Sequence, residues 1–384
     1  MKLIAYFEGD ESLKSWLSSL VSCQVEYKKM PLRNDSSSYS DLPAYVSDIL
    51  YLDKPDLILS MQHDGHEKPL LSVEFASCTP QYQHALQRFS RMLASVSTYC
   101  PSVLIIPESK RENSGEDRVY KRSAAVEYGA VKLMDIYDTP CFILDWPSDE
   151  NDLLMNEKNT QYPRIDSEGI SQLKEFMQAC IESREDVNYI DSLSKKKIVN
   201  QLKDAIRTRA YRNGVPSISN PAGGSKKSSV KLDLTDTSKL LDEISNKSHL
   251  HKAICTKVPS FISDRKESLV FYPTRITAHA GDPYVGMIGY YDIAFVRFGK
   301  STRERYYNLV AYADDVSISE VTGVMSKFVE KTCPFNNPLS QSNSKMYNYH
   351  LKNGCRETKS KPVRIYAELA DIIIFKDGVL FNAG

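Results

Sequence analysis

Continuous and alternating apolar runs divide the first 150 residues into short strands and amphipathic helices. The runs "LILSMQ" and "LLSVEFA" flank "HDGHEKP", whose Asp-Gly step is typical of a tight turn, so they predict a β-hairpin. Thr79 and Pro80 then supply a capping hydroxyl and a proline suited to the first helical position. Apolar residues recur after them at three- to four-residue spacing and predict the buried side of a helix: Tyr82, Leu86, Phe89, Leu93 and Val96.

Two further strands and a helix complete this first region. The runs "SVLIIP" and "PCFILDW" are short and continuously apolar, as in strands covered by helices on both faces. Between them, "YKRSAAVEYGAVKLMDIY" predicts a helix. Upstream, "MKLIAYF" predicts a strand, and "DESLKSWLSSLVS" and "PAYVSDILYLDKPD" predict helices. The pattern therefore predicts an α/β (α+β) fold with a mixed central sheet flanked by helices.

The pattern changes after the acidic connector that follows Pro147. Helices are predicted around 167–184 and 189–210, and "VPSISNPAGGSKKSS" has the composition of a loop or linker. We therefore expect a domain over residues 1–214, a linker or loop over 215–230 and a second α+β domain over 231–384. In the second domain we expect helices near 236–257 and 319–331, and an antiparallel sheet from the aromatic runs "SLVFYP", "MIGYYDIAFVRFG" and "YYNLVAYADDVSI".

Composition excludes several classes of function. Lys+Arg and Asp+Glu both number 49, so the net charge is zero and only local clusters can indicate a nucleic-acid partner. The 8 cysteines show no CxxC spacing, which argues against a zinc knuckle and suggests reduced thiols in a cytosol. No phosphate-loop or dinucleotide-binding glycine motif is present. No apolar run reaches the roughly 18 residues of a membrane helix, so we expect a soluble cytoplasmic protein.

Two carboxylates of the predicted hairpin suggest a metal site. Asp56 opens its first strand and Glu74 lies within its second, and antiparallel pairing can bring them side by side. Adjacent carboxylates repel each other, and a divalent cation such as Mg²⁺ would relieve the repulsion. Such a cation can polarise a phosphodiester and generate hydroxide from water. The structural alternative is that Asp56 begins a strand after Pro55 and that Glu74 is the exposed position of a half-buried strand.

Asp56 and Glu74, in their setting of strand, strand, helix, strand, helix and strand, resemble the PD-(D/E)XK nuclease superfamily, which includes many restriction endonucleases. The resemblance covers roughly residues 50–146. It implies that the two carboxylates hold Mg²⁺ and that a lysine two residues after the second one orients the attacking water. That position is Ala76 here.

A substitute for the missing lysine must then come from elsewhere in the chain. Gln87, on the helix after the hairpin, is our candidate for a further catalytic residue, and Lys121, which opens the next predicted helix, is our candidate for a displaced lysine. Lys68 is a third possibility, and Glu8 could add a carboxylate. His63, His66 and Cys78 have no partner with catalytic spacing, so we assign them structural roles.

Cations that could contact nucleic acid lie in three places. Arg88 and Arg91 follow Gln87 on the same predicted helix. The basic helix around 189–210 carries Lys196, Lys203 and Arg207 on one side and apolar residues on another. The turn in "FGKSTRERYY", around position 304, sets Glu304 between two arginines. For each set the alternative is an ordinary solvated surface.

Together these features predict a metal-dependent endonuclease of the restriction-enzyme type that hydrolyses double-stranded DNA. We expect a homodimer in which the second domain recognises DNA, pairs the subunits, or both. Ala76 supports a rival hypothesis, a catalytically inactive DNA-binding or regulatory protein with the nuclease fold. The zero net charge supports a third, an interaction protein without a nucleic-acid partner.

Overall fold

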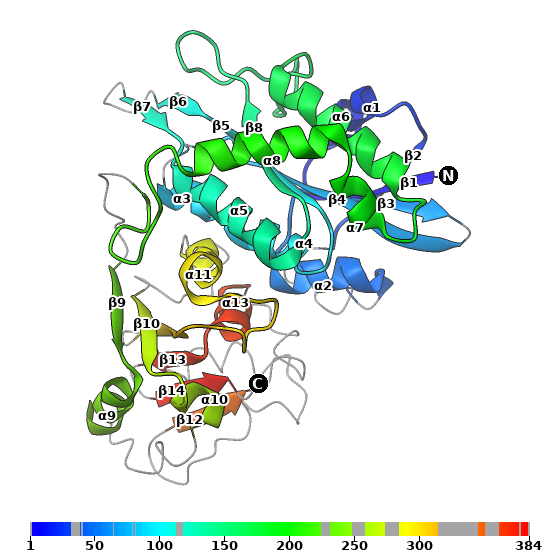
Figure 1. Cartoon of the computed structure of the whole chain (residues 1–384). Helices are drawn as coiled ribbons and strands as arrows, with labels where there is room; N and C mark the ends of the chain where they lie inside the picture. Colours follow the sequence, from blue (N-terminus) through cyan, green and yellow to red (C-terminus); the bar gives the residue numbers. More distant parts are fainter. Residues whose placement is uncertain are drawn as a thin grey trace.

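The computed structural model describes thirteen stretches of the chain: residues 2–31, 39, 41–63, 65–78, 80, 82–112, 118–223, 231–247, 258–272, 284–313, 345–349, 361–375 and 378–382. Their helices and strands form two six-stranded mixed sheets with flanking helices and a separate two-stranded hairpin (Figure 1). The predicted α/β (α+β) class is thus confirmed. Within these stretches no helix has both the length and the apolar character required to cross a bilayer.

The first sheet has the strand order β2-β1-β3-β4-β5-β8. The strands β1 and β2, β4 and β5, and β5 and β8 pair in parallel, whereas β3 is antiparallel to both of its neighbours. The strand bounds are β1 Lys2–Phe7, β2 Val25–Lys29, β3 Leu57–His63, β4 His66–Phe75, β5 Ser102–Pro107 and β8 Cys141–Trp146. The predicted hairpin is β3–β4, and Gly65 in its turn has the positive φ of 79° that favours glycine.

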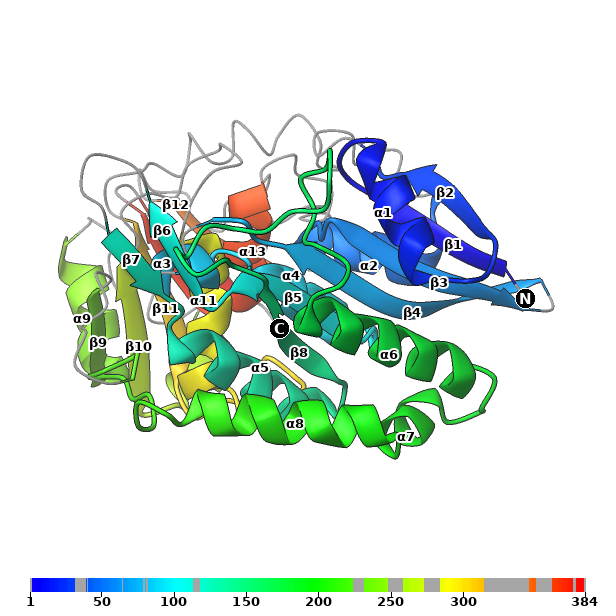
Figure 2. The same cartoon turned by 90° about the horizontal axis from the view of Figure 1, so that it is seen from above.

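Helices cover both faces of this sheet (Figure 2). Phe75 packs on Trp16 of α1, and Phe142 packs on Phe176 of α6, so α1 and α6 share one face. The opposite face carries α2, α4 and α5, and α8 packs beside α5 at the β8 edge. The helix bounds are α1 Ser12–Leu20, α2 Ala44–Leu52, α3 Tyr82–Leu86, α4 Phe89–Val96, α5 Ala124–Tyr137, α6 Glu168–Ser183, α7 Tyr189–Ser194 and α8 Lys197–Ala210.

Three predicted helices of the first region differ from the structure. The helix after Pro80 is divided into α3 and α4, although its apolar stripe faces the core as predicted. The helix over 189–210 is divided into α7 and α8. The predicted helix start at Lys121 is wrong, because Lys121 ends β7 (Arg118–Lys121), which pairs with β6 (Ser109–Glu112), and α5 begins only at Ala124.

The second sheet has the order β12-β14-β13-β11-β10-β9. The expectation of an antiparallel sheet is wrong, since β10, β11 and β13 run parallel. The run "MIGYYDIAFVRFG" is also no strand but a buried helix, α11, continued by a π-helix, η2. The bounds are β9 Lys231–Asp236, α9 Thr237–Lys247, α10 Ser260–Ser263, β10 Glu267–Tyr272, α11 Val285–Tyr291, η2 Asp292–Val296, β11 Asn308–Ala313, β12 Lys345–Tyr349, α13 Lys361–Leu369, β13 Ile372–Phe375 and β14 Gly378–Asn382.

One hydrophobic core joins the two sheets. Helix α11 packs against α3 and α4, and the rings of Phe89 and Tyr290 lie 5.7 Å apart edge to face. The Tyr290 hydroxyl also donates to the Pro221 carbonyl oxygen at 2.9 Å, which fixes part of the predicted linker. The domain boundaries themselves stay a prediction, and the helix expected near 319–331 lies outside the described residues.

Candidate functional site

The first two candidate residues meet where β3 begins and β4 ends. Leu57 pairs with Val73 in the antiparallel register, which sets Asp56 beside Glu74. The Asp56 backbone N–H donates to Glu74 Oε2 at 3.2 Å, and the Phe75 backbone N–H donates to Asp56 Oδ2 at 2.8 Å. Each carboxylate is therefore oriented by the neighbouring strand rather than by a mobile side chain.

The guanidinium of Arg91, on α4, lies between these carboxylates. Its Nη1 donates to Glu74 Oε1 and lies 3.7 Å from Asp56 Oδ1, while its Nε lies 3.7 Å from Asp53 Oδ1. Asp53, which follows α2, accepts a hydrogen bond from the Ser90 hydroxyl. We call Asp53, Asp56, Glu74 and Arg91 the Arg91 cluster. The sequence analysis missed Asp53, although its position next to "KPD" could have indicated it.

Burial dominates the electrostatics of the cluster. Burial raises the pKa of the Glu74 carboxyl to about 8, although the positive charge of Arg91 lowers it. Burial alone would lower the pKa of the Arg91 guanidinium, but Glu74 and Asp53 raise it above its usual range. Because this raised pKa already includes the effect of Arg91, the Glu74 carboxyl is mostly protonated at neutral pH, and a further cation would favour its ionised form.

The cluster has more carboxylates than arginines around it and is open on one side. Its three carboxylates face Arg91 and the neighbouring Arg88, whose Nη1 lies 3.2 Å from Glu74 Oε1. If all are ionised, one negative charge remains unbalanced. The side chain of Glu74 is 1% exposed, whereas that of Asp56 is 25% exposed, so solvent reaches the cluster at Asp56.

The donor set of the cluster has the chemistry that Mg²⁺ prefers. Asp56 and Glu74 offer carboxylate oxygens on adjacent strand ends, and Mg²⁺ commonly takes one or two carboxylates together with water and phosphate. Asp56 Oδ1 and Glu74 Oε1 both face Arg91 Nη1, so a cation that bridged them would compete with this guanidinium. No group of three or more His, Cys, Asp and Glu side chains within the described stretches is arranged to hold a metal ion. A metal site here would thus rest on the two carboxylates.

The motif position Ala76 is buried, and its backbone N–H donates to the Ile105 carbonyl oxygen at 2.8 Å. Lys68 is no substitute, because it lies six residues before Glu74 on β4, roughly 20 Å away along an extended strand. Lys121 ends β7, is exposed and pairs in register with Ser109. Lys110 on β6 reaches the chain just beyond β4, where its Nζ donates to the Ser77 carbonyl oxygen at 2.7 Å, and the sequence pattern did not single it out.

Gln87 and Arg88 occupy the turn between α3 and α4. Arg88 reaches Glu74, with 29% of its side chain exposed, so it lies at the rim of the Arg91 cluster. The half-buried Gln87 is its neighbour, with its backbone packed under Gly286 of α11. Glu8, at the end of β1, approaches the cluster through Lys54, whose Nζ lies 3.5 Å from Glu8 Oε1. The structure therefore gathers Asp56, Glu74, Arg88 and Arg91, with Gln87 and Glu8 beside them.

The cations of α8 lie elsewhere and have partners within the protein. Lys196 Nζ lies 2.8 Å from Glu182 Oε2, and Arg207 Nη2 lies 3.2 Å from Asp135 Oδ1. Burial lowers the pKa of the Lys203 ammonium, which stands near Arg207. These contacts favour the solvated-surface alternative for α8, although they do not prevent an exchange of partners with phosphate.

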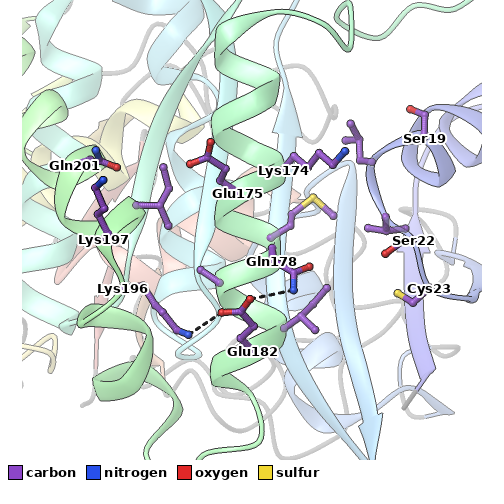
Figure 3. A pocket seen from close by; sticks show the side chains of 16 residues that line it. Ser19, Ser22, Cys23, Lys174, Glu175, Gln178, Glu182, Lys196, Lys197 and Gln201 are labelled. Atoms are coloured by element: carbon purple, nitrogen blue, oxygen red, sulfur yellow. Dashed lines mark hydrogen bonds and ion pairs between the residues drawn. The ribbon is translucent and has the colours of Figure 1, made fainter.

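Lys196 borders a groove of about 980 Å³ between the end of α1, the middle of α6 and the start of α8 (Figure 3). Lys174 and Lys197 also line it, while Glu182 in its floor is held by Lys196 and Gln178. The groove shares no residue with the Arg91 cluster. It lies on the α1 and α6 side of the sheet, whereas Arg91 belongs to α4 on the other face.

The basic turn around position 304 belongs to the second region. Arg305 is buried against Asp371 and Asp292, whereas Arg303 and Glu304 are exposed. The expectation that Asp292 lies in a strand is wrong, because it begins η2.

Comparison with known proteins adds no relative. No protein-family model matches the chain, and no curated protein and no solved structure matches it significantly.

Proposed function

We propose that the chain is a metal-dependent endonuclease that hydrolyses DNA phosphodiester bonds at the Arg91 cluster. One observation carries the proposal: Asp56 and Glu74 sit on adjacent strand ends, each fixed by a backbone N–H of the other strand, with a cation between their outer oxygens. A buried carboxyl group with a strongly perturbed pKa, beside a charged partner in a cluster open to solvent on one side, is a candidate for a functional site.

We assign a separate role to each residue in and around the Arg91 cluster. Asp56 and Glu74 would hold Mg²⁺, which when bound supplies a Lewis acid for the phosphodiester. Arg88, at the exposed rim, has donors left for a phosphate oxygen and so would position the strand. Asp56 is open to solvent and can accept a proton from water. Gln87 and Lys121 stay proposals for residues that orient this water.

The test is divalent-cation-dependent cleavage by the full chain. Plasmid and linear double-stranded DNA, methylated and unmethylated, are incubated with the protein in Mg²⁺, in Mn²⁺ and in EDTA. We expect cleavage with a cation and none in EDTA. Asp56→Asn and Glu74→Gln should each reduce the rate by at least about a hundredfold while circular dichroism shows a folded protein. Cleavage at the wild-type rate by either variant would contradict the assignment of the site.

A second candidate function is favoured by Arg91 and Ala76. Arg91 already supplies a fixed positive charge between the carboxylates, and the lysine position of the nuclease motif holds a buried methyl group. A chain of this kind would bind DNA without cutting it. Salt-sensitive DNA binding together with no cleavage in any divalent cation would support this function over the first. If the protein neither binds nor cleaves DNA, the third hypothesis is favoured, an interaction protein without a nucleic-acid partner.

A further inference from the structure

Two aromatic rings stand exposed on a tight turn of the second region. In the turn over 297–305, the Phe298 backbone N–H donates to the Glu304 carbonyl oxygen at 2.9 Å, and the Tyr306 N–H donates to the Val296 carbonyl oxygen at 2.9 Å. Phe298 is 52% exposed and Tyr306 is 65% exposed, and their ring centroids lie 4.8 Å apart. We call these two residues the aromatic platform.

Buried arginines hold the platform in place. Arg297 Nη1 donates to the Tyr137 hydroxyl at 2.9 Å, and Arg305 Nη1 donates to Asp371 Oδ2 at 2.8 Å. Successive side chains of paired extended segments point to opposite sides. The two inward arginines therefore direct Phe298 and Tyr306 outward. Such rings are ordered before any partner arrives, which lowers the entropic cost of binding.

Two cations, Lys300 and Arg303, belong to the same turn as the platform. Lys300 Nζ lies 5.2 Å from the ring centroid of Tyr99, which is itself 51% exposed, and 3.5 Å from Asp138. The exposed Arg303 has its guanidinium carbon 5.4 Å from the Phe261 ring centroid. The one carboxylate of the turn, Glu304, is folded back, and its Oε2 accepts the Ser301 N–H at 2.8 Å. The turn therefore carries both exposed aromatic rings and positive charge.

We propose that the aromatic platform stacks the unpaired bases of single-stranded nucleic acid, and that Lys300 and Arg303 bind the adjoining phosphates. Stacking on exposed aromatic rings with nearby cations is the usual way to bind single strands without sequence preference. A second copy of this chain would also cover apolar rings, and it is one outcome of the test below. The inference rests on the nucleic-acid partner of the proposed function, although it does not depend on cleavage.

The turn that carries the platform contacts the chain just after α4, whereas the Arg91 cluster lies at the start of this helix. Lys300 contacts Tyr99 just beyond the C-terminal end of this helix, whereas Arg91 lies in its first turn. Eight residues at the helical rise correspond to roughly 12 Å between these two positions on the chain. The contribution of the platform to binding can be measured separately from cleavage.

The test compares two oligonucleotides of equal length in EDTA, where no cleavage occurs. One is a single-stranded DNA of mixed sequence, and the other is an abasic strand with the same phosphates and no bases. Phe298→Ala and Tyr306→Ala should each weaken binding of the first about tenfold and leave binding of the second unchanged. Phe298→Tyr and Tyr306→Phe keep the rings and should keep the affinity. Because both side chains are exposed, thermal unfolding should be the same in all four variants.

Three results would overturn the inference. These are unchanged binding of both strands in the alanine variants, an equal loss for both strands, or a wild-type protein that binds both strands alike. A change of oligomeric state in the alanine variants with no change in affinity would assign the platform to a second copy instead. Metal-dependent cleavage of duplex DNA that is lost in Glu74→Gln would uphold the proposed function in any of these cases.

Discussion

Arg91 is the residue on which the interpretation of the site depends. A buried guanidinium between carboxylates is stable only while its partners remain, because removing one member of a buried ion pair leaves an uncompensated charge. The same position would suit a divalent cation, since Asp56 Oδ1 and Glu74 Oε1 face it from two strands. Two hypotheses therefore differ in what they predict for a variant of Arg91: one is that Arg91 only stabilises the fold, and the other is that it occupies a site for a divalent cation.

The variant Arg91→Met tests whether the cluster binds a divalent cation once the guanidinium is absent. It removes the positive charge and leaves the neighbouring carboxylates of Asp53, Asp56 and Glu74 to repel one another, so the free energy of unfolding should fall by about 3–5 kcal/mol. Millimolar Ca²⁺ binds carboxylates without supporting most phosphodiester hydrolysis, and it should recover part of this loss. Urea unfolding with and without Ca²⁺ measures both quantities.

The matched control for this experiment is the double variant Arg91→Met with Glu74→Gln. It lacks one of the two carboxylates that a cation would bridge, so Ca²⁺ should no longer stabilise it. Equal stabilisation of the single and double variants by Ca²⁺ would place the cation elsewhere. No stabilisation of either variant would favour the inactive nucleic-acid-binding protein.

The missing motif lysine can be tested with two lysines of one hairpin. Lys110 on β6 reaches the Ser77 carbonyl oxygen, three residues beyond Glu74, whereas Lys121 on β7 lies at the other side of the same hairpin. If Lys110 acts in the transition state, Lys110→Ala should lower the cleavage rate by about 10–100-fold with nearly unchanged DNA affinity. Single-turnover kinetics separate the two effects. A larger loss in Lys121→Ala than in Lys110→Ala would restore Lys121 as the displaced lysine.

At the scale of elements, the sequence correctly predicted the strands whose hydrophobic pattern is compatible with a single type of secondary structure. The hairpin β3–β4, the strands β5 and β8, and the register that sets Asp56 beside Glu74 follow from short apolar runs bounded by turn residues. The pairing of Glu74 with Arg91 could not be predicted, because it depends on how α4 is placed over the sheet.

Two of the segments that escaped prediction did so for opposite reasons. The strands β6 and β7, "SKRE" and "RVYK", are polar and exposed, so they carry no hydrophobic period at all. The run that forms α11 and η2 is apolar except for Asp292, because it is buried among α3, α4, α5 and α13, and a fully buried helix cannot be told from a buried strand by periodicity.

The basic helix α8 gives a prediction at this scale. Lys203→Glu with Arg207→Glu should weaken DNA binding equally for all sequences and flatten its dependence on salt, since phosphate contacts carry no sequence information. Lys239→Glu on α9 is a control that reverses one exposed charge elsewhere. An unchanged salt slope in an equilibrium titration would return α8 to an ordinary charged surface whose cations pair with Glu182 and Asp135.

At the scale of the whole molecule, the second region supports the turn that carries Gln87 and Arg88. A Cβ atom at Gly286 of α11 would lie 2.0 Å from the Leu86 carbonyl oxygen and 2.6 Å from the Gln87 backbone. Backbone atoms cannot yield as a flexible side chain does, so only glycine allows this approach. Buried ion pairs of Asp292 with Arg297 and Arg305 then continue the contact from η2 toward the second sheet.

Gly286→Ala should therefore disturb the Arg91 cluster from the other side of the molecule. The added methyl group must push α11 away from the turn between α3 and α4, and overpacking of this kind costs typically 1–3 kcal/mol. Gly289→Ala, one turn along α11, is the matched control, because its Cβ would lie 3.3 Å from the Leu93 side chain, which can shift.

Trp16 and Trp146 both belong to the first sheet region, so tryptophan fluorescence during urea unfolding reports on that region alone. We expect Gly286→Ala to lower the urea midpoint seen by tryptophan fluorescence and to weaken cleavage, and Gly289→Ala to leave both nearly unchanged. If the two regions were energetically independent, Gly286→Ala would alter far-ultraviolet circular dichroism at a lower urea concentration while the tryptophan transition kept its wild-type midpoint.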